Sequence, residues 1–189
     1  NNSDKIHEFK YLNSKLNLVL CKSCGLGYLN PRWTKEQYLI YYKERYDETY
    51  RPDLKVEKRK QHPKKINIVL ERFKTHNISF TNAKKILDIG SGAGENLMAF
   101  KQEYSQLECY GIEPSLASQK LLKQQNINII ADDVDSDWEK THRGKFDIII
   151  MRHVLEHFLN PLEVLKKVNG VLNKNGILYI AVPNNLVEK

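Results

Sequence analysis

The stretch that decides the fold is residues 84–97, which read KKILDIGSGAGENL. Its apolar start, from Ile86 to Ile89, is typical of a short strand buried on both faces, as strands of parallel sheets are. Glycines at alternate positions follow at once, and glycine permits positive φ angles and the close approach of a ligand. Glu95 and Asn96 then begin a helix, whose free N–H groups face whatever the turn holds. The stretch therefore predicts a nucleotide-binding strand, turn and helix.

The spacing of the glycines distinguishes between nucleotide ligands. The dinucleotide-binding pattern G-x-G-x-x-G would place its third glycine at position 95, which is Glu95. The pattern present is Asp88-x-Gly90-x-Gly92-x-Gly94. A carboxylate at Glu95 would repel a pyrophosphate but would tolerate a cationic ligand. These residues favour a ligand that combines an adenosine with a positive charge, and a glycine turn that binds nothing is the alternative.

The same pattern, Asp88-x-Gly90-x-Gly92-x-Gly94, resembles the first motif of the class I methyltransferases that depend on S-adenosylmethionine. The resemblance implies a Rossmann-like fold, S-adenosylmethionine as cofactor and S-adenosylhomocysteine as product. It also implies in-line transfer of a methyl group from sulfur to an O, N or C atom of the acceptor. Positioning and desolvation would then supply most of the acceleration.

From Lys85 onward, apolar strands alternate with helical segments. We expect strands at 107–112, 127–130, 146–151 and 177–182 and helices at 115–125 and from Asn160 onward. This rhythm predicts an α/β fold with a doubly wound, mostly parallel sheet and helices on both faces. The resemblance implies the strand order 3-2-1-4-5 and two further strands that this sequence lacks. Because 177–182 is too apolar for an exposed edge, we expect further C-terminal residues, or another chain as in a homodimer, to cover it.

Candidate cofactor ligands follow the second and third strands of this series. Glu113, at the end of the second strand, could accept hydrogen bonds from ribose hydroxyls, and the resemblance assigns Glu113 and its neighbour Pro114 to the cofactor site. Members of the family often carry an acid after the third strand that accepts a hydrogen bond from the adenine amino group. Asp132 and Asp133 both suit that role, with Asp133 preferred, and Val134 is the apolar neighbour of the ring. A solvated acid is the alternative for each carboxylate.

The segment after the fourth strand is the candidate site of the reaction. Family members with a similar H-V-L-E-H segment line the methionine half of the cofactor with the residues just after this strand, here Met151, Arg152 and His153. A histidine there is suited to take a proton from an acceptor at neutral pH. His153 is the first choice as base and His157 the second. A packing or capping role for either histidine is the alternative.

The N-terminal part contains Cys21-Lys-Ser-Cys24-Gly, the pattern of a zinc knuckle. It resembles the second knuckle of a zinc ribbon that precedes the catalytic domain in a subset of these methyltransferases, including several that act on nucleotide sugars and surface polysaccharide precursors. A structural zinc site needs four ligands, and the first pair of cysteines would fall before Asn1. Cys109 is better explained as a core residue. The sequence thus predicts an incomplete Zn²⁺ site at Cys21 and Cys24.

Tyrosines recur every four residues from Tyr38 to Tyr50, which is the spacing of one helix face. Packing in the core is the favoured explanation, and an aromatic lid over the active site is the alternative. A basic segment follows, with nine Lys or Arg against three acidic residues from Arg51 to Lys74. A helix is expected from Pro63 to Lys74, with its inward side chains at positions 66, 69, 70 and 73. A solvated face is favoured over an RNA-binding patch, because no aromatic platform or RNA-binding signature accompanies these charges.

The cysteine content and the changes in composition along the chain indicate a cellular location and segment boundaries. The three cysteines are too few for a disulfide framework, which fits a reducing cytoplasm, and neither a signal peptide nor a membrane span is recognisable. We expect a zinc-ribbon-like and helical segment at 1–50, a basic helix and linker at 51–82, and a methyltransferase domain at 83–189. The sequence has no N-P-P-Y signature, which is typical of methyltransferases that act on amino groups of DNA and proteins. Its absence favours a small-molecule or saccharide acceptor. The alternatives are an RNA methyltransferase that uses 51–74 and a non-catalytic partner with the same fold, while Glu95 disfavours an NAD-dependent oxidoreductase.

Overall fold

The computed structural model describes residues 2–11, 14–46 and 67–184. The chain divides into two compact units, one from Asn1 to Tyr38 and one from Leu39 to Lys189. Tyr50, the basic residues from Arg51 to Lys65 and the predicted inward residue Ile66 lie outside the described residues.

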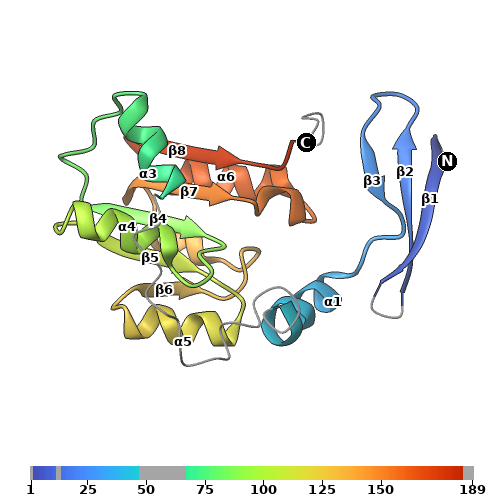
Figure 1. Ribbon diagram of the computed structural model, residues 1–189, viewed down its shortest axis with the longest axis horizontal. Coiled ribbons are helices and arrows are strands. Elements are labelled where there is room, and N and C mark those ends of the chain that lie inside the picture. The colour runs from blue at the N-terminus through green and yellow to red at the C-terminus, as the bar shows by residue number, and fades with distance from the viewer. Residues whose placement is uncertain (1, 12–13, 47–66, 185–189) are drawn as a thin grey trace. The chain divides into compact units, whose positions relative to one another are not determined.

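The first unit is a small antiparallel sheet with the order β1-β2-β3 (Figure 1). Its strands are β1 (Ser3–Tyr11), β2 (Ser14–Cys21) and β3 (Gly27–Leu29). Cys21 is the last residue of β2, and the turn that follows it contains Cys24. The cysteine pair therefore lies where the sequence predicts a knuckle, at the bend between two strands.

A helical segment follows, and its second half is not α-helical. The α-helix α1 (Lys35–Ile40) continues into the π-helix η1 (Tyr41–Arg45). Tyr41, which is outside the predicted four-residue repeat, is buried, whereas Tyr42 and Tyr46 are half-buried. Tyr42 and Tyr46 still share one side of the helix, since their ring centroids are 5.1 Å apart.

The second unit contains a five-stranded parallel sheet with the order β6-β5-β4-β7-β8. Counted along the chain from Lys85, this order is 3-2-1-4-5. The strands are β4 (Lys85–Ile89), β5 (Glu108–Ile112), β6 (Asn128–Ala131), β7 (Phe146–Arg152) and β8 (Leu172–Ala181). The helices are α3 (Ile68–Thr75), α4 (Glu95–Glu103), α5 (Leu116–Gln124) and α6 (Pro161–Val171), with short 3₁₀ turns η3 (Trp138–Thr141) and η4 (Leu155–His157).

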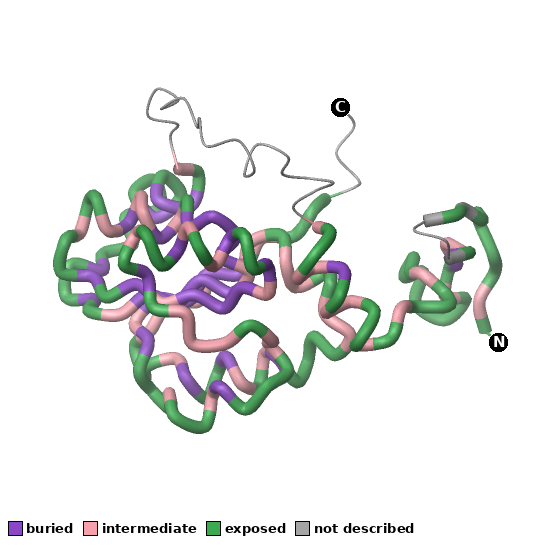
Figure 2. The backbone as a smooth tube through the Cα atoms, turned by 90° about the horizontal axis from the view of Figure 1, so that it is seen from below, coloured by how far each residue is buried: buried purple, intermediate pink, exposed green. Residues whose placement is uncertain are grey.

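Helices cover both faces of this sheet, as the alternation of strands and helices predicts. Along β7, Ile148 and Ile150 pack into the core formed with α3, α4 and α5. Ile149 and Met151 point the other way, into the core formed with α6 and η3. Successive side chains of a strand alternate between its faces, so β7 supplies both cores at once. Figure 2 shows the buried residues concentrated in the central strands.

Two predicted connections differ from the structure. The linker expected within 51–82 contains Phe80, which is buried with Ala83 in the core with α3. Phe80 contacts Phe73 at a ring centroid distance of 5.3 Å, so this connection is part of the domain. The strand expected at 177–182 begins earlier, so residues 173–176 lie inside β8, whose pairing with β7 shifts register between Phe146 and Ile148.

β8 is one edge of the described sheet, and its outer end remains apolar and accessible. Ile180 is 40% exposed and Val182, just beyond the strand, is 49% exposed. The expectation that further residues or another chain cover this edge stays a prediction. Among the described residues, no helix has the length and apolar character needed to span a membrane.

Asp147, near the start of β7, connects three strands at the amino end of the sheet, opposite the end that carries the glycine turn. Its Oδ2 accepts hydrogen bonds from the backbone N–H groups of Lys84 at 2.7 Å and Lys85 at 3.0 Å. Its Oδ1 accepts one from Asn173 Nδ2 at 2.9 Å. Burial alone would raise the pKa of Asp147, but these hydrogen bonds outweigh it and hold the pKa below its ordinary value.

We therefore expect Asp147→Ala to lower the free energy of unfolding by about 1 kcal/mol, because it removes hydrogen bonds that join β4, β7 and β8. Urea denaturation at neutral pH measures the change. Asp137→Ala is the control, since the Asp137 carboxylate is exposed and pairs with the exposed Lys140, and it should change the same free energy by less than about 0.5 kcal/mol. Equal effects of the two substitutions would contradict the assigned role of Asp147.

Candidate functional site

The turn after β4 takes a conformation that requires glycine. Gly90, Gly92 and Gly94 have φ angles of 74°, 54° and 81°. A Cβ atom at Gly90 would lie 2.8 Å from Val154 Cγ2, and one at Gly94 would lie 2.6 Å from Gln125 Oε1. Neighbouring side chains thus already occupy the space that a larger residue would need. The turn is also tied to β5, since Gly90 N donates to the carbonyl of Ile112 at 2.8 Å.

Glu113, just beyond the end of β5, lies directly against this turn. Its carboxylate is buried and accepts the N–H of Gly92 at 2.6 Å and the N–H of Ser115 at 2.9 Å. Gln119 donates to the backbone carbonyl of Glu113 at 2.7 Å. The predicted ribose acid and the predicted glycine turn therefore form one hydrogen-bonded unit. Pro114 is half-buried between Glu113 and the N-cap residue Ser115.

Asp88 is the second buried carboxylate at this edge, with 1% of its surface exposed. Burial, reinforced by the negative charge of Glu113, raises its pKa to about 7, against the opposing effects of a hydrogen bond from Asn96 and the charge of Arg152. Asn96 Nδ2 donates to Asp88 Oδ2 at 3.0 Å. Asp88 therefore changes its protonation near neutral pH.

A residue that the sequence analysis missed holds Asn96 in place. Asn67 is the N-cap of α3, and its Oδ1 accepts the backbone N–H groups of Val69 and Leu70. Its Nδ2 donates to Asn96 Oδ1 at 3.1 Å. A chain of hydrogen bonds thus runs from the start of α3 through Asn96 to Asp88. An N-cap asparagine is recognisable in a sequence, but its second partner is not.

In the loop after β6, the two candidate adenine acids have different partners. Asp132 forms an ion pair with Lys43 of η1 at 2.7 Å, and Lys43 holds the pKa of Asp132 below its ordinary value. Asp133 Oδ1 instead accepts the backbone N–H of Asp135 at 2.9 Å. Val134 is half-buried next to them. Both acids follow β6 at the same sheet edge as Asp88 and Glu113, because the carboxyl ends of parallel strands share one edge.

The residues that follow β7 are positioned by an unusual backbone conformation. Met151 is buried, Arg152 is half-buried, and His153 is exposed with a φ angle of 53°, in the left-handed region. The N–H of His153 donates to the carbonyl of Ala181 at 2.8 Å, which holds the bend against β8. Backbone strain of this kind occurs disproportionately at functional sites.

His157 lies in the same segment and contacts the helical region that precedes it in sequence by more than a hundred residues. Its Nε2 is 3.8 Å from Glu156 Oε1. Its ring lies 6.1 Å from the ring of Tyr42, which belongs to η1. Tyr42 and Lys43 thus bring η1 to the ends of β7 and β6. This arrangement agrees with the alternative that the tyrosine segment covers the site.

The cysteine pair shows only part of a metal site. The pKa of Cys21 is lowered, chiefly by a hydrogen bond from the backbone N–H of Cys24. Within residues 2–11, 14–46 and 67–184, no group of three or more His, Cys, Asp or Glu side chains is placed to hold a metal ion. Zinc at Cys21 and Cys24 stays a prediction.

Comparison with known proteins gives a consistent family. Residues 56–189 match the model of a family described as a methyltransferase domain. The chain is similar to the uncharacterized protein RP028 of Rickettsia prowazekii (strain Madrid E), with 30% identity over 106 residues that cover 51% of this chain and 42% of that protein. It is also similar to a ubiquinone biosynthesis O-methyltransferase of Glaesserella parasuis serovar 5, with 28% identity over 113 residues that cover 56% of this chain and 48% of that protein. The chain spans less than half the length of these two relatives.

Solved structures share the fold. A SAM-dependent methyltransferase from Archaeoglobus fulgidus superposes with a TM-score of 0.52 and 22% identity, over 62% of this chain and 52% of that one. The plantazolicin methyltransferase BpumL, in complex with a pentazolic desmethylPZN analog and SAH, superposes with a TM-score of 0.50 and 24% identity, over 60% of this chain and 43% of that one. The parallel sheet and its helices are therefore those of a Rossmann-like methyltransferase fold.

The strained conformation of His153 predicts an unusual order of stabilities. At a φ of 53°, glycine avoids a steric cost of roughly 1 kcal/mol that alanine retains, so His153→Gly should be about 1 kcal/mol more stable to urea than His153→Ala. The same pair of substitutions at the exposed His76, where φ is −91°, should show the opposite order. Equal stabilities of the two variants at position 153 would be evidence against the strained backbone.

Asp88 predicts a specific pH dependence of stability. Its pKa is raised from 3.8 to about 7 in the folded protein, so the folded state binds the proton more tightly than the unfolded state does. Stability should therefore fall as the pH rises from about 4 to about 7, and then level off. In Asp88→Asn, which mimics the protonated carboxyl, this fall should be absent. Urea denaturation of both proteins between pH 4 and pH 8 tests the sign, and parallel curves would refute it.

Proposed function

This chain belongs to the methyltransferase-domain family, and from that premise we propose that it is a methyltransferase that uses S-adenosylmethionine. The proposed acceptor is a small molecule or a saccharide, methylated at O, N or C. The observation that supports the cofactor best is the pair of buried carboxylates, Asp88 and Glu113, on either side of the glycine turn.

The chemistry of these donors suits the proposed cofactor better than a phosphate-containing one. Two buried acids and the nearby Glu95 make this end of α4 unfavourable for a pyrophosphate, despite the free N–H groups of the first turn. The same acids favour ligand hydroxyl and ammonium groups. We propose that Glu113 accepts hydrogen bonds from the ribose and that Asp88 faces the positively charged part of the ligand. S-adenosylmethionine, when bound, supplies a methyl group activated by the positive charge on its sulfur.

The chain's own residues would bind and orient the cofactor and remove a proton from the acceptor. Gly90, Gly92 and Gly94 leave room for close approach, and Asp133 with Val134 would receive the adenine. Met151, Arg152 and His153 would line the side of the reacting group. His153, which is exposed at the bend after β7, is the proposed base for an acceptor that carries a proton, and His157 is the second choice.

Finer features of the proposal depend on other observations. The names of curated relatives that refer to ubiquinone biosynthesis support an acceptor that is a small molecule with a hydroxyl group. The contact between Tyr42 and His157 supports an aromatic wall beside the acceptor. Zinc at Cys21 and Cys24, a second copy of the chain along β8, and a cytoplasmic location remain predictions from the sequence.

Calorimetric titration with S-adenosylmethionine, S-adenosylhomocysteine and NAD tests the cofactor. We expect micromolar binding of the first two ligands and none of NAD. Asp88→Asn and Glu113→Gln should each weaken S-adenosylmethionine binding at least about tenfold, because each removes a charged partner of the ligand. Glu103→Gln, at the far end of α4, is the control and should bind normally. Binding of NAD, or no binding by the folded wild-type protein, would refute the proposal.

A further inference from the structure

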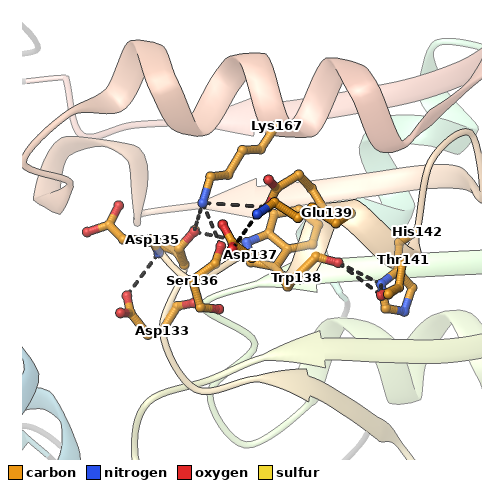
Figure 3. A network of polar contacts seen from close by, with 11 residues as sticks. Asp133, Asp135, Ser136, Asp137, Trp138, Glu139, Thr141, His142 and Lys167 are labelled. Carbon is orange, nitrogen blue, oxygen red and sulfur yellow. Dashed lines mark hydrogen bonds and ion pairs between the residues drawn. The ribbon is translucent and has the colours of Figure 1, made fainter.

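A lysine of α6 donates hydrogen bonds to the backbone of the loop that follows β6. Lys167 Nζ donates to the carbonyl of Ser136 at 2.6 Å and to the carbonyl of Val134 at 3.3 Å. Figure 3 shows the Lys167 side chain extending from α6 toward the loop that contains Ser136. One flexible cation thus fixes two backbone positions that are only two residues apart.

The environment of Lys167 makes these contacts persistent. The Lys167 side chain is 19% exposed, and Glu139 Oε2 lies 3.6 Å from its Nζ with a side chain that is 23% exposed. Trp138, buried at 5% exposure, donates from Nε1 to the same Val134 carbonyl at 2.9 Å. Because the ammonium is largely withdrawn from water, its bonds to the loop are worth more than those of a surface lysine.

The loop itself is closed by short-range bonds around Asp133. Ser136 donates from its hydroxyl to the Asp133 carbonyl at 2.7 Å, and the N–H of Asp135 donates to Asp133 Oδ1 at 2.9 Å. These bonds shape the turn but do not connect it to the rest of the domain. Lys167 connects the loop to α6.

We propose that Lys167 is a positioning residue for the adenine end of the cofactor site. By fixing the backbone from Val134 to Ser136, it sets where the Asp133 carboxylate and the Val134 side chain lie. The inference depends on the proposed function, since it takes this loop as the adenine-binding segment. Lys167 does not itself touch the ligand: its effect is on recognition of the adenine amino group.

The test compares two ligands that differ only at that group. S-adenosylhomocysteine carries the amino group, and its 6-deamino (purine riboside) analogue carries a hydrogen atom in its place, so N1 stays an acceptor and the carboxylate loses its donor. We expect the wild-type protein to bind the first about tenfold more tightly in calorimetric titration. Lys167→Met should weaken S-adenosylhomocysteine about tenfold and the 6-deamino analogue by no more than about twofold, so that the preference disappears.

Lys166→Met is the matched control, because Lys166 is the adjacent residue but is 63% exposed and pairs with Glu163 on the surface. It should leave both affinities and their ratio unchanged. Lys167→Arg should restore most of the preference, since a guanidinium also donates to two carbonyls. If Lys167→Met proves unfolded, Lys167→Gln, which keeps a donor but not the charge, serves for the same comparison.

Three other results of these titrations would contradict the role of Lys167 or the proposed function. Equal weakening of both ligands in the Lys167 variants would mean that Lys167 only stabilises the fold, and would overturn this inference. A wild-type protein that binds both ligands equally well would also overturn it, because there would be no amino-group recognition to position. A folded wild-type protein that binds neither ligand would overturn the proposed function, and this inference with it.

Discussion

The site depends on the burial of two carboxylates beside a turn that only glycine can form. Glu113 can be buried because the N–H groups of Gly92 and Ser115 bind it. The Asp88 carboxylate accepts fewer hydrogen bonds, and its burial raises its pKa to about 7. A buried acid that is incompletely satisfied is costly to the folded protein, so Asp88 supports the proposed cationic or hydroxyl-bearing ligand.

Residues outside the motifs hold this arrangement in place. Asn67 and Asn96 connect the start of α3 to Asp88, and Lys167 connects α6 to the loop after β6. Lys43 connects η1 to Asp132 from another direction. Each contact joins segments that are far apart in sequence, so the carboxyl edge of the sheet is fixed from several sides. Such supporting contacts are what keep binding groups in a productive geometry.

The π-helix η1 contacts the segments that follow β6 and β7. Tyr41 is buried, Tyr42 lies near His157, and Lys43 pairs with Asp132. Tyr42 and Tyr46, four positions apart, lie together with ring centroids 5.1 Å apart. Tyr41 is buried whereas Tyr42 and Tyr46 are half-buried, and core packing stays the favoured explanation of the tyrosine repeat.

Short-range patterns in the amino-acid sequence predict the glycine turn, the parallel sheet and the acids at its edge. Apolar runs of strand length, glycines that need positive φ and helix-capping residues act over a few positions, so they can be recognised in the sequence. The burial of Phe80 in the core, the left-handed conformation of His153 and the contact of Lys167 with the loop after β6 could not be predicted in this way. These depend on which side chains meet across the fold, and a lysine on a helix face has the same local sequence signal whether it points to solvent or to a backbone carbonyl.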